Sequence, residues 1–383
     1  MKKNTAIPAI RFKGFTAPWE QRELGNIFKY EQPQAYIVKN TKYNENFKIP
    51  VLTAGQSFIL GYTDENFGVK NASSESPVII FDDFTTASHF VDFSFKIKSS
   101  AMKLLTLNNP NDNVQCAYQI LQNLSYTPLT HSRHWISTFS KFKVLIPESH
   151  KEQNQIGALF SNLERLITLH QRKLKKLHNI KKSMLEKMFP QKGSCYPEIR
   201  FKGFTAPWEQ RKFEEIAVRS SSISSNVSLP RIEYEDIVSG TGQLNKDIYA
   251  KDRNKPGLAF HPGDILYGKL RPYLKNWLLP AFNGLAVGDF WVLEPQNIDS
   301  KFLYCLIQIR QFDAVANQST GTKMPRADWK LVSKTTFSIP SSTREQATIG
   351  AYFAALDTLI TLHQRKLKKL HNIKKSMLEK MFV

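Results

Sequence analysis

Polar and basic residues gather at the ends of apolar runs in two stretches of the chain, the first up to Arg133 and the second beyond residue 260, where a strand would give way to a loop. In the second stretch, the run GDILYGKLRPYL at 263–274 and the turn GTKMPR at 321–326 are examples. An arginine in such a loop can contact guanine through two hydrogen bonds or hold a phosphate. We therefore expect these loops to bind DNA. The candidate DNA-binding residues are Thr53, Gln56, Asp82 and Arg133 in the first stretch and Lys269, Arg271, Tyr273, Thr322, Lys323 and Arg326 in the second.

Two of these arginines hold the same place in the two stretches. Arg133 precedes Pro147 by 14 residues, and Arg326 precedes Pro340 by the same distance. The position alone does not separate a base contact from a phosphate clamp or a surface salt bridge.

Catalytic signatures are missing from the sequence. No GxxxxGK[ST] phosphate loop and no NPP[FY] adenine-methyltransferase motif occurs, so we expect no nucleotide hydrolysis by this chain. Asp82 and Asp83 could hold a nuclease metal, but adjacent aspartates at a strand end are more often acceptors for loop amides. We therefore expect no catalytic, cofactor-binding or metal-binding residues.

The net charge indicates the class of partner. The chain has 53 Lys and Arg against 33 Asp and Glu, a net charge of +20. Such an excess favours a polyanion, and nucleic acid first, because phosphate contacts supply most non-specific affinity. The alternative is that the charge serves solubility alone.

Length and composition predict a folded protein inside the cell. A chain of 383 residues is long enough for two or three domains. Its three cysteines show no CxxC spacing, which is typical of reduced thiols in the cytoplasm. No run of 18 apolar residues and no signal-peptide pattern occurs, so we expect no membrane association.

Two segments occur twice, in the same order. IRFKGFTAPWEQR stands at 10–22 and again at 199–211, and LITLHQRKLKKLHNIKKSMLEKMF stands at 166–189 and 359–382. We call these duplicated segments the frame. The segments between them, 23–146 and 212–339, have almost nothing in common. This pattern indicates an adaptor with two different recognition domains.

The second repeat predicts two long helices. Ser149 and Thr343 are plausible N-caps, each followed by a Glu-Gln pair where negative charge favours the helix dipole. Residues spaced four and three apart form an a/d pattern, which we call the apolar seam. We expect the two helices to pair as an antiparallel intramolecular coiled coil; the alternative is that each lies on its own domain. The seam residues are Ile156, Phe160, Leu163, Ile167, His170, Leu174, Leu177, Lys181, Met184 and Met188, with Ile349, Phe353, Leu356, Ile360, His363, Leu367, Leu370, Lys374, Met377 and Met381 in the second copy.

The exposed positions of these two helices carry the same residues in both copies, as the seam positions do. Packing alone would not require this, although a recent duplication could produce it without function. We expect two equivalent surfaces for two copies of one partner. The candidate partner-docking residues are Arg172, Lys173, Lys176, Arg365, Lys366 and Lys369.

The first repeat is a short aromatic arm, with Trp19 and Trp208 at equivalent places. Its aromatic residues could stack on bases, but we favour an arm whose aromatics fill a core. The fold class expected is α/β (α+β), with two mixed α/β domains, two long helices and a pseudo-twofold axis. The domain ranges expected are 1–149 with an arm at 8–22, a helix at 150–190, 191–341 with an arm at 197–211, and a helix at 342–383.

Two variable domains alternating with long helices that open P-x(4)-E-Q-x-x-I-G resemble the specificity (S) subunit of type I restriction–modification systems. The matching residues run from Pro147 to Phe160 and from Pro340 to Phe353. The resemblance implies a non-catalytic subunit whose domains each read half of a bipartite duplex DNA target. It also implies two adenine methyltransferase (M) subunits and restriction (R) subunits as partners, which use S-adenosylmethionine, ATP and Mg. The rival interpretations are a self-contained nuclease or methylase, and a scaffold that binds RNA or an acidic protein.

Overall fold

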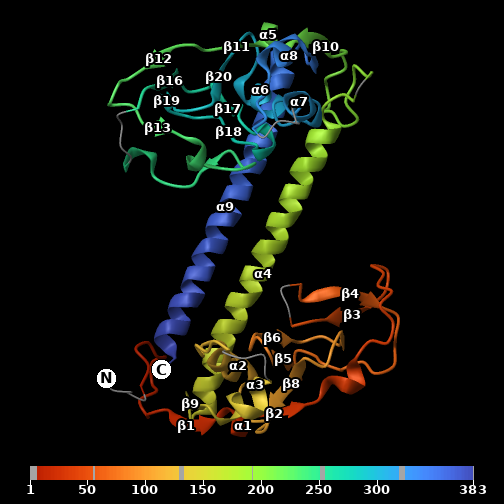
Figure 1. Cartoon of the computed structure of the whole chain (residues 1–383), viewed down its shortest axis with the longest axis vertical. Helices are drawn as coiled ribbons and strands as arrows, with labels where there is room; N and C mark the ends of the chain where they lie inside the picture. Colours follow the sequence, from red (N-terminus) through yellow and green to blue (C-terminus); the bar gives the residue numbers. More distant parts are fainter. Residues whose placement is uncertain are drawn as a thin grey trace. The chain divides into compact units, whose positions relative to one another are not determined.

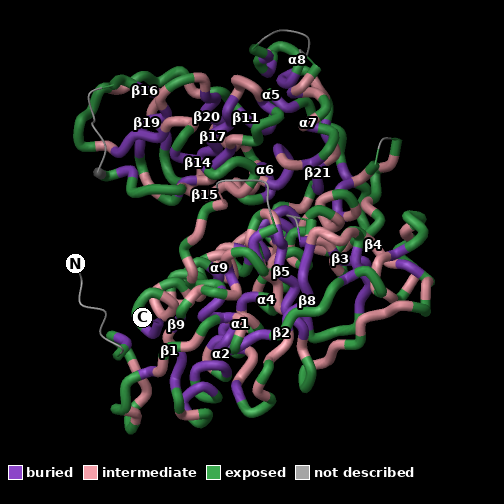
Figure 2. Tube along the Cα trace, turned by 60° about the horizontal axis from the view of Figure 1, so that its bottom comes forward, coloured by how far each residue is buried: buried purple, intermediate pink, exposed green. Residues whose placement is uncertain are grey.

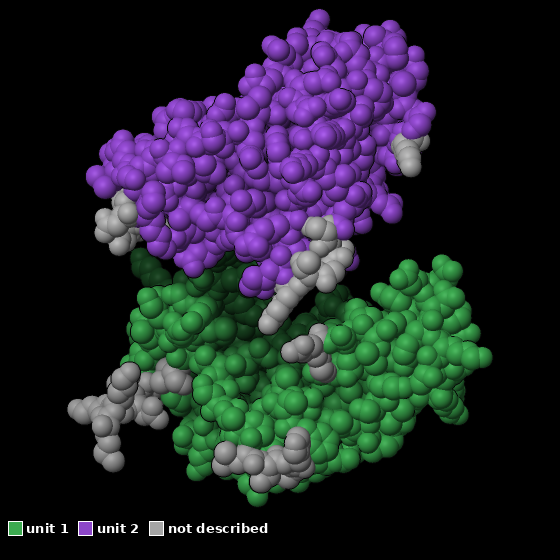
Figure 3. All heavy atoms as spheres, turned by 45° about the horizontal axis from the view of Figure 1, so that its top comes forward, with its two compact units in different colours: residues 1–170, 366–383 green, residues 171–365 purple. Residues whose placement is uncertain are grey.

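The computed structural model describes residues 7–54, 57–128, 133–191, 193–250, 255–318 and 324–382 (Figure 1). The chain forms two compact units, coloured separately in Figure 3. Unit 1 contains residues 1–170 and 366–383, and unit 2 contains residues 171–365. The two long helices therefore contribute to both units.

Unit 1 is built on a four-stranded antiparallel sheet with the order β2-β8-β5-β6. A second sheet has the order β4-β3-β7, in which β3 and β7 are parallel. The strands of the two sheets are β2 (Phe28–Glu31), β3 (Ile49–Leu52), β4 (Ile59–Thr63), β5 (Val78–Asp82), β6 (Ser88–Val91), β7 (Lys96–Ile97) and β8 (Met102–Leu107). The short helices are α1 (Leu24–Ile27), η1 (Pro33–Tyr36), α2 (Val114–Gln122), α3 (His134–Ser137) and η2 (Phe139–Lys141).

Unit 2 repeats this plan with different residues. Its main sheet has the order β11-β20-β17-β18, strand for strand equivalent to β2-β8-β5-β6. The strands outside the frame are β11 (Ala217–Arg219), β12 (Ile223–Ser224), β13 (Arg231–Ile232), β14 (Ile237–Val238), β15 (Gln243–Leu244), β16 (Gly257–Phe260), β17 (Ile265–Gly268), β18 (Trp277–Leu278), β19 (Gly284–Ala286) and β20 (Phe290–Pro295). The helices are α5 (Phe213–Ile216), η3 (Tyr234–Asp236), η4 (Ile248–Ala250), η5 (Pro272–Leu274), α6 (Ser300–Leu306), α7 (Arg310–Ala316) and α8 (Trp329–Lys334).

Several apolar stretches of the sequence, each long enough for one strand, form hairpins or strand–turn units in the structure. The stretch 48–63 forms β3 and β4, and 235–244 forms η3, β14 and β15. The stretch 263–274 contains β17 and then η5, and 285–295 contains β19 and β20. The apolar runs at 116–124 and 301–309 correspond to α2 and α6, which begin and end one to three residues earlier. Composition alone did not locate these turns, whose residues Ser239, Gly240 and Gly288 are exposed.

The arm of each repeat leads into a two-stranded ribbon. β1 (Glu20–Glu23) pairs with β9 (Lys143–Ile146), and β10 (Glu209–Lys212) pairs with β21 (Thr336–Ile339). Trp19 and Trp208 are buried, and each packs edge-on against the phenylalanine that follows a long helix, Phe382 and Phe189 respectively. The prediction that these tryptophans fill a core is confirmed.

The long helices are α4 (His150–Lys187) and α9 (Thr343–Met381), and they pack together. In unit 1 the start of α4 packs against the end of α9, through Phe160 and Phe382 among others. In unit 2 the start of α9 packs against the end of α4, through Phe353 and Phe189. The helices are therefore antiparallel within each unit, and every predicted seam residue is buried or half-buried. Figure 2 colours the chain by burial.

Each of the two lysines on the seam pairs with an acid of the facing helix. Lys181 lies 2.7 Å from Asp357 of the facing helix, and the equivalent Lys374 pairs with Glu164. These ion pairs satisfy the two lysines of a mostly apolar seam. The N-cap predicted at Thr343 is wrong, because α9 begins at that residue and the Ser342 hydroxyl accepts from the Glu345 amide at 3.4 Å.

Among the described helices, none is long and apolar enough to cross a membrane.

Candidate nucleic-acid interface

Unit 2 brings two of the predicted recognition segments together at the end of β17. The Ala327 amide donates to the Lys269 carbonyl at 2.8 Å, and the Arg271 amide donates to the Pro325 carbonyl at 2.7 Å. Leu270 and Arg326 form an antiparallel bridge between these two bonds. Four candidate residues therefore share one edge, which we call the loop edge of unit 2: Lys269, Arg271, Tyr273 and Arg326.

The backbone of this edge is held in an uncommon conformation. Arg271 and Lys275 have φ angles of 50° and 56°, in the left-handed region that side chains rarely adopt. Between them lies Tyr273, half of which is exposed. Such strain persists only where surrounding contacts impose it, and it concentrates at binding sites. The Arg271 Nε is buried and has no hydrogen-bond partner among the described residues.

A single carboxylate organises the cations of this edge. Asp289 lies 3.4 Å from Lys269 Nζ and 3.0 Å from Arg326 Nη2. Partial burial acts to raise the pKa of Asp289, but the hydrogen bonds and charges of Arg326 and Lys269 outweigh it and lower the pKa. Asp289 is therefore ionised at neutral pH, and it neutralises one of the two positive charges. Sequence reasoning missed this residue, because nothing in the string GDFW marks its neighbours in space.

Unit 1 repeats the backbone of this edge with other side chains. After β5, the His134 amide donates to the Asp83 carbonyl at 2.9 Å, as Ala327 does to Lys269 after β17. Arg133 is exposed and directly precedes His134, so it occupies the place of Arg326. The predicted equivalence of these two arginines is therefore visible in the backbone. We call Arg133 and the turn from Asp82 to Thr86 the loop edge of unit 1.

The two aspartates of this turn serve the fold. Asp82 accepts from the amides of Phe84 and Thr85, at 2.9 and 3.1 Å. Asp83 is fully buried, accepts from the Trp135 amide at 2.8 Å and lies 3.5 Å from Lys103 Nζ. The described residues contain no cluster of three or more metal-ligating side chains. Thr53 is half-buried beside β3, whereas Gln56, Thr322 and Lys323 lie outside the described residues.

The predicted docking residues of the long helices are all exposed. Arg172, Lys173 and Lys176 lie on α4 in unit 2, and Lys366 and Lys369 lie on α9 in unit 1. Arg365 is the last residue of unit 2. Within the described part of the chain, no ion pair neutralises any of the six. On α4, Arg172, Lys175 and Lys176 border a hollow of about 450 Å³ that is also lined by Asn179, Ile180 and Met184.

A buried polar cluster fixes each arm to the start of a long helix. Arg11 binds both carboxylate oxygens of Glu152 at 2.6 and 2.7 Å, and Trp19 Nε1 lies 3.4 Å from the same carboxylate. Arg200, Trp208 and Glu345 repeat the arrangement at 2.7, 2.8 and 3.3 Å. The sequence pattern indicated a helix-dipole role for these glutamates. Their burial shows that the main role is an ion pair with the arm.

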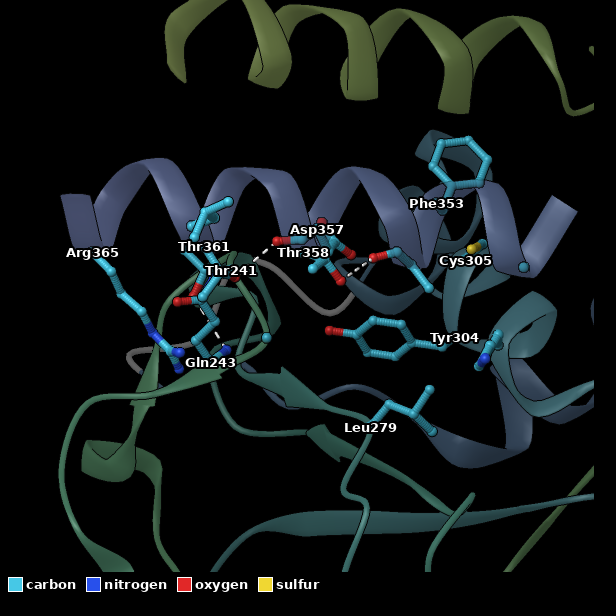
Figure 4. A pocket seen from close by; sticks show the side chains of 15 residues that line it. Thr241, Gln243, Leu279, Tyr304, Cys305, Phe353, Asp357, Thr358, Thr361 and Arg365 are labelled. Carbon is cyan, nitrogen blue, oxygen red and sulfur yellow. Dashed lines mark hydrogen bonds between the residues drawn. The ribbon is translucent and has the colours of Figure 1, made fainter. Parts of the chain in front are cut away.

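A cavity in unit 2 lies between α9 and the hairpin of β14 and β15. It has a volume of about 470 Å³ and is lined by Leu279, Tyr304 and Phe353 among others. Figure 4 shows Gln243 of the hairpin reaching Thr361 of α9, and its Nε2 donates to the hydroxyl at 2.5 Å. This contact ties part of the recognition fold directly to the helix.

These features define a basic protein in which one duplicated frame carries two α/β domains that share a plan but differ in sequence. The family described as "Type I restriction modification DNA specificity domain" matches residues 17–179 and 281–372. Because this is more than half of the chain, the chain belongs to that family. The family description assigns the matched residues to a DNA specificity domain of type I restriction–modification systems.

Individual relatives agree with this assignment. The chain is 51% identical over 127 residues to the specificity subunit of the type I restriction enzyme EcoR124I/EcoR124II of Escherichia coli, which is 32% of this chain and 31% of that relative. It thus spans less than a third of that relative's length. It is 21% identical over 396 residues to the MjaVIII specificity subunit of Methanocaldococcus jannaschii, covering 94% and 91% of the two chains. The crystal structure of the type I S subunit from M. genitalium superposes with a TM-score of 0.68 at 16% identity, over 98% and 99% of the chains, which shows a common fold.

The family confirms four predictions: the fold class, the DNA-specificity function, the resemblance to S subunits and the non-catalytic role. The rival interpretations, a self-contained enzyme and a scaffold for RNA or acidic protein, are thereby set aside.

Proposed function

We propose that each unit reads one half of a bipartite duplex DNA target through its loop edge. The observation that carries this proposal is the pairing of one backbone arrangement with two sets of side chains. Equivalent positions hold Asp83 in unit 1 and Lys269 in unit 2, whereas Arg133 and Arg326 are the same residue type. Two edges of equal shape and different chemistry suit two different base sequences. The proposal also includes Thr53, Gln56, Thr322 and Lys323 as DNA contacts. Asp82, already engaged by turn amides, supports its loop.

The long helices are proposed to dock two M subunits at equivalent surfaces. Arg172, Lys173 and Lys176 on α4 correspond to Arg365, Lys366 and Lys369 on α9, because the helices repeat at an offset of 193 residues. Exposed cations beside apolar side chains suit a partner surface that carries acidic residues and an apolar centre. R subunits would join this complex in the cytoplasm. S-adenosylmethionine, ATP and Mg would then be bound by these partners.

The division of labour among segments is also proposed. The ranges 1–149 and 191–341 would be the recognition domains, and 150–190 and 342–383 the helices that set the gap between half-sites. This division predicts that 23–146 and 212–339 can be exchanged independently.

Exchange of one segment tests the reading of half-sites. A chain in which 23–146 comes from a subunit with another target should change one half of the methylated sequence and keep the other. Methylation-site sequencing of cells that carry the chimera with its M subunit is the measurement. A change in both halves, or in neither, would contradict the division.

Stoichiometry tests the docking surfaces. The mass of the reconstituted complex should show two M subunits per chain. Changing Arg172, Lys173 and Lys176 to Glu should remove one of them, and the equivalent change of Arg365, Lys366 and Lys369 should remove the other. One M subunit per unmodified chain would refute the proposal.

A further inference from the structure

The loop edge of unit 2 carries a charge arrangement that the loop edge of unit 1 does not. The two oxygens of Asp289 face different cations: Oδ1 is 3.4 Å from Lys269 Nζ, and Oδ2 is 3.0 Å from Arg326 Nη2. Both cations are candidate DNA contacts. The acid that joins them is about a quarter exposed and lies on the same edge.

The backbone around Asp289 is fixed from two sides. Its carbonyl accepts from the Lys269 amide at 2.9 Å and also from the Tyr234 hydroxyl. The same hydroxyl accepts from the Leu270 amide at 3.1 Å. The backbone of Asp289 is therefore tied to the start of the turn at Lys269 and Leu270, which keeps its carboxylate close to the Lys269 side chain.

The equivalent position in unit 1 lacks the acid. There the Ala101 carbonyl accepts from the Asp83 amide at 3.0 Å, as the Asp289 carbonyl does from Lys269. Alanine at this place shows that the backbone arrangement does not need a carboxylate. The carboxylate of Asp289 therefore serves something other than the fold of the turn.

We propose that Asp289 is a positioning residue that orients Lys269 and Arg326 for base contacts and suppresses their sequence-independent attraction to phosphate. The inference rests on the proposed reading of DNA by this edge. A long cationic side chain loses rotamer freedom when it binds, so a carboxylate that orders it beforehand reduces that cost. The carboxylate also cancels one positive charge, which lowers affinity for DNA of any sequence.

The two effects predict an unusual phenotype for Asp289→Asn. The amide keeps the shape and removes the charge, so the edge gains one net positive charge and loses its order. We expect tighter binding to non-specific duplex and a steeper salt dependence, by about 0.9 in the log–log slope for one added phosphate contact. Discrimination between an intact and a scrambled second half-site should fall about tenfold. A residue needed only for folding would instead weaken both kinds of binding.

The experiment uses the full complex with M subunits and duplexes that carry the methylated sequence found by sequencing. Three duplexes are compared: intact, with the unit 2 half-site scrambled, and with the unit 1 half-site scrambled. Asp289→Ala copies the residue at Ala101 and should behave like Asp289→Asn. Glu209→Gln adds the same charge on β10, where Glu209 pairs with Arg211 at 3.3 Å, and should leave discrimination unchanged.

The outcomes separate this inference from the proposed function. If Arg326→Ala and Lys269→Ala abolish discrimination at one half-site but Asp289→Asn matches the unmodified chain, the role of Asp289 is refuted and the reading edge stands. If Arg326→Ala and Lys269→Ala leave both half-sites intact, the reading edge itself is refuted. Equal loss of specific and non-specific binding by Asp289→Asn would show a structural role and also overturn the inference.

Discussion

Arg200 and Glu345 form a two-pronged ion pair, with Nε–Oε1 and Nη2–Oε2 distances of 2.7 and 2.8 Å. Glu345 is almost fully buried, and hydrogen bonding to it raises the pKa of Arg200. The pair joins the arm that precedes β10 to the first turn of α9. Since Arg11 and Glu152 form the same pair in unit 1, each arm depends on a long helix for its place.

Removing the carboxylate should therefore destabilise unit 2. Glu345→Gln keeps the shape but leaves a largely buried guanidinium without its counter-charge, and we expect a loss of roughly 2–4 kcal/mol. The control is Glu198→Gln, because Glu198 pairs with Lys187 in solvent and should cost less than about 1 kcal/mol. Urea denaturation measures the free energy of unfolding of both variants. Equal stability of the two variants would contradict the role assigned to the pair.

The ion pairs on the seam predict a compensating exchange. Lys181 and Asp357 lie on facing helices 2.7 Å apart, both partly shielded from solvent. Lys181→Asp alone places two acids together and should cost roughly 1 kcal/mol or more. Adding Asp357→Lys restores opposite charges in reversed order. Thermal midpoints of the two single variants and the double variant give the coupling. If the loss of stability in the double variant equals the sum of the losses in the two single variants, the pair does not help to fix the helix register.

The cavity beneath α9 offers a matched pair of glycines. Gly240 and Gly242 have φ angles of 70° and 66°, so alanine is strained at both, by about 1–2 kcal/mol. A Cβ at Gly242 would also lie 1.9 Å from the Tyr304 hydroxyl, whereas one at Gly240 meets nothing within 4 Å. We expect Gly242→Ala to cost roughly 1–3 kcal/mol more than Gly240→Ala.

A second substitution checks the cause of this difference. Tyr304→Phe removes the hydroxyl, so it should recover much of the extra loss in Gly242→Ala and little in Gly240→Ala. The measurement is the denaturation midpoint of Gly240→Ala and Gly242→Ala, each alone and each combined with Tyr304→Phe. No recovery would show that the hairpin is not held against Tyr304 as described.

The sequence predicted the frame well because the frame is periodic and duplicated. The seam from Ile156 to Met188 follows from spacing alone, and all of its positions are at least half-buried. The motif E-Q-x-x-I-G was noticed as a repeat, but its contacts required the fold. Gln153 accepts from the Asn113 amide at 2.8 Å, and a Cβ at Gly157 would lie 2.1 Å from the Asn113 side chain.

The recognition domains were predicted less well because their contacts join distant, unpatterned residues. Asp289 acquires its role from Lys269 and Arg326, 20 and 37 positions away. No periodicity links these three positions. The sequence suggested that Asp82 accepts from loop amides and also made it a candidate DNA contact, and the structure identifies the amides as those of Phe84 and Thr85. A base-reading edge cannot be specified from residue types alone, since the same turn accommodates an acid or a cation.

The last prediction concerns the gap between half-sites and rests on the proposal that the helices set it. Arg172 and Arg365 are equivalent positions near the boundary of the two units. Inserting four residues after each adds about one turn, or about 6 Å, to both helices. The pairs Lys181–Asp357 and Glu164–Lys374 then both survive, because each lies wholly within one unit.

The spacer should lengthen by roughly one or two base pairs, since DNA rises about 3.4 Å per base pair. Both half-sites should keep their sequences, which methylation-site sequencing will show. An insertion after Lys176 alone lengthens only α4 and moves Lys181 a full turn from Asp357. The single-insertion variant should therefore be unstable, or should keep the original spacer length. An active double insertion with an unchanged spacer would place control of the gap outside the helices, in the M subunits or in the arms that contain Trp19 and Trp208.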